Sequence, residues 1–77
     1  MEVEFMDWED DTDVCGEAAA LIGDGRFLDL VVTPTTTGAV WDVIDGTVRI
    51  ASAIATTVAE AKNAALAAGR RALMRAV

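Results

Sequence analysis

The chain contains no histidine and no tyrosine, and Cys15 is its only cysteine. Without histidine, the commonest general base and the commonest nitrogen ligand for metal ions are both missing. A lone cysteine cannot form an intrachain disulfide, and here it has no histidine to activate it as a nucleophile. We therefore expect a protein that is not an enzyme and that needs no metal or cofactor.

Long apolar segments are also missing. No run approaches the roughly 18 apolar residues typical of a transmembrane helix, and the N-terminus is acidic where a secretory signal needs positive charge. The 53% hydrophobic fraction is mostly alanine and aliphatic side chains, because the chain has only two tryptophans and two phenylalanines. The 77-residue sequence predicts one small domain, residues 1–77, with a cytoplasmic location.

Positive charge is absent from the first 25 residues, and five of the six basic residues lie at or after Arg49. The net charge is -7. This distribution argues against direct binding to nucleic acid or to an anionic membrane, and it favours a basic surface on a protein partner. The acidic residues that precede the first base are Glu2, Glu4, Asp7, Glu9, Asp10, Asp11, Asp13, Glu17 and Asp24.

Acidic residues are densest at residues 7–13, where five carboxylates surround one tryptophan. In an extended chain, a rise of about 3.3 Å per residue spreads five charges over roughly 20 Å, close to the one charge per ~3.4 Å of a single DNA strand. A phosphate-binding groove would accept such a row, and the tryptophan would add an apolar anchor. Alternatively, the acids only solubilise the domain and the tryptophan fills its core. The candidate partner-binding residues are Asp7, Trp8, Glu9, Asp10, Asp11 and Asp13.

A helix is predicted to begin at Val58, because Thr57 and Glu60 have the spacing of a capping box. Arg70, Arg71 and Arg75 follow near its C-terminal end, where positive charge complements the helix dipole. At 100° per residue, one broad face collects Val58, Ala61, Ala65, Leu66, Gly69, Ala72, Leu73 and Ala76.

A β-hairpin is predicted just before this helix, because Asp45-Gly46 separates two apolar runs. A two-residue turn at this dipeptide would pair Trp41 with Ile50 and Asp42 with Arg49. The alternation then places Trp41, Val43, Val48 and Ile50 on one face, and Asp42 and Arg49 on the other.

A strand is also predicted at 27–33, followed by a loop at 33–38. Together with the hairpin, it gives an α+β fold: an antiparallel sheet of three or four strands with the long C-terminal helix packed on one face. Leu28, Leu30 and Val32 are expected beneath the helix.

The N-terminal third allows two interpretations. Residues 17–22 form either a short helix capped by Asp13 or a strand that pairs with 27–32 through a Gly-Asp-Gly turn, and the alanines slightly favour the helix. Residues 1–8 alternate apolar and acidic side chains, which suits an edge strand.

Aliphatic side chains are also expected on the outer face of the sheet, which indicates a second layer made by the N-terminal segment or by a second copy of the protein. Val31, Val40 and Ile44 would point to this side. The candidate dimer interface comprises Val40 and Ile44, with Ala64, Ala67 and Met74 as a second patch.

Residues 41–73 combine an aromatic strand, an Asp-Gly turn and a Thr-x-x-Glu-Ala helix, and they resemble a pattern common in small phage and proteobacterial proteins. The compact acidic chain as a whole looks like the small inhibitors of phages and mobile elements, particularly anti-CRISPR proteins. That resemblance implies a Cas protein or Cascade-type complex as partner, in the bacterial cytoplasm, with the acidic residues blocking its DNA-binding surface. These inhibitors share no binding motif, so no residue is carried over by alignment.

A β-meander followed by this helix is also similar to HicB-like antitoxins, whose acidic surface meets a basic toxin. The sequence lacks their usual proline-containing strand end after the second strand, and it has no room for a separate DNA-binding domain. The third hypothesis is an oligomerising structural protein whose acids keep it soluble.

Overall fold

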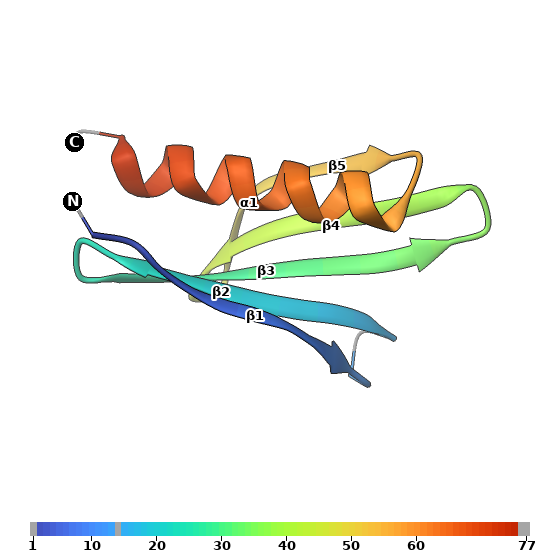
Figure 1. The fold of residues 1–77 in the computed structure, drawn as a ribbon, viewed down its shortest axis with the longest axis horizontal. Helices are drawn as coiled ribbons and strands as arrows, with labels where there is room; N and C mark the ends of the chain where they lie inside the picture. Colours follow the sequence, from blue (N-terminus) through green and yellow to red (C-terminus); the bar gives the residue numbers. More distant parts are fainter. Residues whose placement is uncertain (1, 14, 76–77) are drawn as a thin grey trace.

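A computed structural model describes residues 2–13 and 15–75 as one antiparallel sheet with a helix across one face (Figure 1). The strands follow one another in the sheet in sequence order, so every neighbouring pair is a hairpin. The elements are β1 (Glu4–Asp11), β2 (Gly16–Gly23), β3 (Arg26–Thr35), β4 (Gly38–Asp45), β5 (Val48–Ala55) and α1 (Val58–Met74).

The α+β class and the helix on one face are confirmed, but the sheet has five strands, so the expected three or four was too low. The preference for a helix at residues 17–22 was wrong, because this segment lies in β2. Asp24 and Gly25 adopt left-handed backbone conformations (φ 52° and 71°), which suits the tight turn of a two-residue hairpin. Pairing with β3 then outweighs the weak helix preference of the alanines.

The acidic N-terminal segment forms β1, which is an edge strand as expected and continues to Asp11. Its register with β2 shifts between Met6 and Glu9, where β1 contains a bulge. Met1, predicted to lie in this strand, and Ala76, predicted on the helix face, are outside the described residues.

The hairpin between β4 and β5 exists, but the predicted register was wrong. Asp45 pairs with Val48, and Trp41 faces Ala53 instead of Ile50. Gly46 takes a positive φ of 66° after the paired Asp45, so the turn lies one residue later than expected, and a second shift follows near Val43. Val48 and Ile50 are consequently 60% and 41% exposed. The expected contact between Asp42 and Arg49 still forms, as an ion pair of 2.9 Å.

The loop predicted at 33–38 is shorter, because β3 continues through Pro34 to Thr35 and pairs there with β4. The paired segment of β2 ends opposite Val32, so Pro34 has a neighbouring strand on one side only. Such an edge position is where a sheet tolerates proline.

The helix begins at Val58 as predicted, and the Glu60 N–H donates to the Thr57 hydroxyl oxygen at 3.0 Å. The Glu60 carboxylate accepts from the Thr56 hydroxyl. Beneath the helix lie fully buried side chains of the sheet, as expected for Leu28, Leu30 and Val32. The helix buries small residues against them, so it lies close to the sheet. The small buried residues of the helix are Ala61, Ala65, Ala68 and Gly69, and Leu73 is buried beside them.

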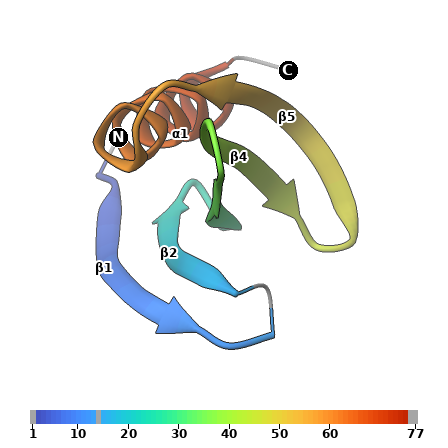
Figure 2. The same cartoon turned by 90° about the vertical axis from the view of Figure 1, so that its right-hand side faces the viewer.

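The sheet is strongly twisted, so β1 and β5 curve in different directions away from the helix (Figure 2). The face opposite α1 carries no second layer among the described residues, since the N-terminal segment extends the sheet sideways instead. Within the same residues, no helix has the length and apolar character needed to cross a bilayer.

Gly16 gives a direct test of the β2–β3 packing. A Cβ atom at this position would lie 2.1 Å from the Val32 carbonyl oxygen, and no side-chain rotation relieves a backbone clash. We expect Gly16→Ala to lower the free energy of unfolding by about 1–3 kcal/mol in urea denaturation. In the control Gly25→Asn, a Cβ meets nothing within 4 Å, and asparagine tolerates the left-handed turn. Equal unfolding midpoints for Gly16→Ala and the wild type would contradict the close approach.

Candidate functional site

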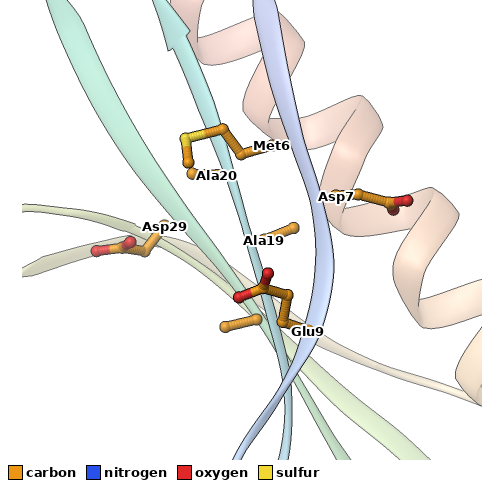
Figure 3. A pocket seen from close by; sticks show the side chains of 7 residues that line it. Met6, Asp7, Glu9, Ala19, Ala20 and Asp29 are labelled. Atoms are coloured by element: carbon orange, nitrogen blue, oxygen red, sulfur yellow. The ribbon is translucent and has the colours of Figure 1, made fainter.

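The acidic segment is extended, but its carboxylates do not form one row. The register of β1 places Glu4, Glu9 and Asp11 on the outer face of the sheet, opposite Ile22, Ala18 and Gly16 respectively. Asp10 pairs with Glu17 on the helix side, and Asp7, at the β1 bulge, points away from Asp29 (Figure 3). On the outer face Glu9 and Asp11 are about 6.6 Å apart, and Glu4 lies about 16 Å before Glu9, so the linear charge density is roughly a third of that of a DNA strand.

Two of the candidate carboxylates also hold the local backbone. Asp7 accepts a hydrogen bond from the N–H of Trp8 at 2.7 Å, and Asp11 accepts one from the N–H of Asp13 at 3.0 Å. The second bond closes an Asx turn after β1, which leaves Asp13 exposed. Asp11 therefore shapes the turn as well as adding charge.

Trp8 is partly buried at the junction of β1 and α1, where it packs against the hydrophobic core. Its ring meets Phe5 edge to face at a centroid distance of 6.5 Å, and the Lys62 ammonium lies 5.5 Å from its centroid. Lys62 also forms a 2.8 Å ion pair with Glu17 of β2. Of the two roles expected for Trp8, the structure supports core packing directly, and part of the ring is taken up by internal contacts.

A hollow of about 400 Å³ opens on the outer face beside β1. The alanines of β2 line it, and Met6 and Glu9 of β1 lie over them, while Asp29 of β3 marks the far side (Figure 3). Sequence analysis missed Asp29 as a surface residue of this site. The signal was its position between Leu28 and Leu30: when both leucines face the helix, the residue between them must face outward.

The negative charge around this hollow is not neutralised within the described residues. The three ion pairs found there are Arg26–Asp45, Arg49–Asp42 and Lys62–Glu17, and none involves a β1 carboxylate or Asp29. The remaining bases, Arg70, Arg71 and Arg75, lie in and just after the last turns of α1. That end of the helix is opposite to the end of the molecule where β1 finishes (Figure 1).

The residues proposed for a dimer interface do not form one patch. Val40 and Ile44 lie on the outer face of β4, and both are partly buried. Ala64, Ala67 and Met74 lie on α1, across the sheet from them, and Met74 is 70% exposed.

Comparisons with known protein families, curated proteins and solved structures find no match for this chain. In the described part of the chain, no three potential metal-ligating side chains lie close enough together to hold an ion.

Truncating Trp8 measures how far it belongs to the core. We expect Trp8→Ala to lower the free energy of unfolding by about 2 kcal/mol, below the cost of a fully buried aromatic because the ring is only partly buried. Asp10→Asn, which changes an exposed group with no ion pair to any described residue, should alter it by less than about 0.5 kcal/mol. Chemical denaturation followed by far-UV circular dichroism distinguishes the two. If Trp8→Ala were as stable as Asp10→Asn, the ring would be a free surface group.

Proposed function

We propose that this protein is an acidic protein-binding inhibitor, of phage or mobile-element origin, that covers a basic nucleic-acid-binding surface on its partner. The binding surface comprises the β1 edge and the adjoining outer face. The observation that carries this proposal is a pair of carboxylates, Glu9 and Asp29, that lie beside an apolar hollow and form no ion pair with any residue in 2–13 or 15–75.

The chemistry of the hollow suits a lysine or arginine side chain. The methyl groups of Ala18 and Ala20 offer an apolar floor for the aliphatic stem, and Met6 supplies a flexible side chain that adapts to its shape. Glu9 and Asp29 then lie beside the charged head, where charge-assisted hydrogen bonds are strong. Lysine and arginine that normally contact phosphate would meet carboxylates in their place.

Charge alone makes an incomplete imitation of DNA. The outer face of β1 presents carboxylates at roughly a third of the linear density of a DNA strand, because β1 divides them between its two sides. Shape and apolar contact at the hollow must therefore contribute to affinity, and long-range attraction from the net charge of -7 speeds the encounter.

The resemblance to anti-CRISPR proteins directs this proposal to Cas effectors. Their guide and target strands lie in positively charged channels, which offer the basic surface that an acidic edge would cover. We expect the wild-type protein to compete with target DNA for at least one effector in a panel of purified Cas complexes. Failure across the panel, together with rescue of growth from a basic toxin, would instead support a HicB-like antitoxin.

Neutralising the hollow provides the sharper test. Glu9→Gln with Asp29→Asn should weaken inhibition of DNA binding about tenfold or more, which corresponds to roughly 1.4 kcal/mol. The matched control is Glu2→Gln with Asp24→Asn: it removes the same two charges at the other end of β1 and β2, and asparagine tolerates the left-handed conformation at position 24. Competition is measured by mobility shift at low and high salt, since screening should reduce the potency of the wild type.

Equal potency of the two double variants would contradict a role for the hollow and leave only net charge as the source of binding. Retained inhibition by both, with no dependence on salt, would overturn the acidic-edge proposal as a whole.

A further inference from the structure

The two edges of the sheet differ in charge. Five of the eight residues of β1 are acidic, and a bulge interrupts the strand. Charge and bulges are the usual devices that keep an edge strand from pairing with another chain. β5, at the other edge, carries one charged residue, Arg49, and its last five residues are Ala-Ser-Ala-Ile-Ala. Its register shift lies before Ala51, so residues 51–55 form a regular strand with an open edge.

Apolar side chains are exposed beside this open edge. Ile54 is 77% exposed, which is the highest value among the large hydrophobic residues described. It lies on the outer face opposite Val40, and Val48 and Ile50 are also exposed earlier in the strand. A regular, neutral edge with aliphatic neighbours is a template for an added strand.

We propose that β5 pairs antiparallel with β5 of a second copy, about a two-fold axis at Ala53, to give a continuous ten-stranded sheet. Ala53 is the centre of the regular segment, so this axis pairs Ala51 with Ala55 and Ser52 with Ile54 across the interface. On the helix side the interface residues are Ala51, Ala53 and Ala55, whose small side chains leave room for the helices above to approach without a clash.

The distribution of charge selects a second copy as the occupant. The first half of β5 lies near positive charge, since Ile50 shares a hollow with Arg71 and Arg75. The end of β5 lies near negative charge, since the Glu60 carboxylate accepts from the Thr56 hydroxyl just after the strand. Antiparallel pairing brings the basic end of each copy toward the acidic end of the other, and no like charges face each other along β5.

The net negative charge does not oppose this arrangement. β1 lies four strands from β5, or roughly 19 Å at about 4.8 Å per strand, which exceeds the Debye length of about 8 Å at physiological salt. The acidic edges therefore remain outermost and screened from each other. The dimer is independent of the proposed inhibitory function, because the hollow beside β1 stays open in it.

Sedimentation equilibrium from micromolar to millimolar protein tests the proposal. We expect the mass to rise toward twice the 8.1 kDa of the single chain. Ile54→Lys should keep the protein monomeric across this range, because it places a charge beside the pairing edge. The matched control is Met6→Lys, which replaces an exposed hydrophobic residue on the same face at the other edge strand and should still dimerise. A monomeric wild type at all concentrations, or dimers that survive Ile54→Lys, would overturn the proposal.

Oxidative cross-linking tests the position of the axis. In a Cys15→Ser background, Ala53→Cys should form a covalent dimer, because antiparallel partners lie within about 4.5–5.5 Å between Cα atoms, a spacing that a disulfide spans. Met6→Cys in the same background should stay monomeric on a non-reducing gel. Cross-linking through Met6→Cys and not through Ala53→Cys would place the interface on β1 or the outer face and exclude β5.

Discussion

One helix has to cover a sheet that is wider than itself. An α-helix with its side chains is about 10–12 Å across, whereas five strands at about 4.8 Å spacing extend over roughly 19 Å. α1 packs mainly over β3 and β4, and the residues that it buries there form the core. Both edge strands consequently extend past the helix. The surface at each edge depends on which side chains pack there.

A group of side chains links the β1 edge to the helix. Trp8 packs against the core, Lys62 lies over its ring, and Glu17 holds the lysine in an ion pair. These contacts link β1, β2 and α1 with both charges only partly exposed. They fix the β1 backbone beside β2, and this position determines which carboxylates face the hollow. The β5 edge has no equivalent group among the described residues, and its aliphatic side chains remain exposed.

The sequence predicted those parts of the fold that depend on local chemistry. The predicted start of α1 was correct because Thr57 and Glu60 interact within one turn of the helix. The predicted burial of Leu28 and Leu30 was correct because alternation along β3 turns both side chains to the same, buried face. The error at residues 17–22 arose because alanine favours a helix only weakly, while the Asp24-Gly25 turn, visible in the sequence, decided for a strand.

Local sequence chemistry did not predict the strand register or the positions of the acidic side chains on the sheet. The turn after Asp45 lies one residue later than the dipeptide rule suggests, and the bulge that follows has no sequence signal of its own. The acidic residues were found from composition, but their division between two faces depends on the β1 bulge, and Asp29 joins them only through strand pairing.

The strand order also has a consequence for the order of synthesis. Because each strand pairs with the one just before it, hairpins can close one after another as the chain leaves the ribosome, with little loop entropy lost at each step. α1 is made after all five strands, yet it covers the leucines of β3. Until it is complete, a nascent chain holds an assembled sheet whose apolar face has no cover, and this interval is when the protein is most exposed to aggregation.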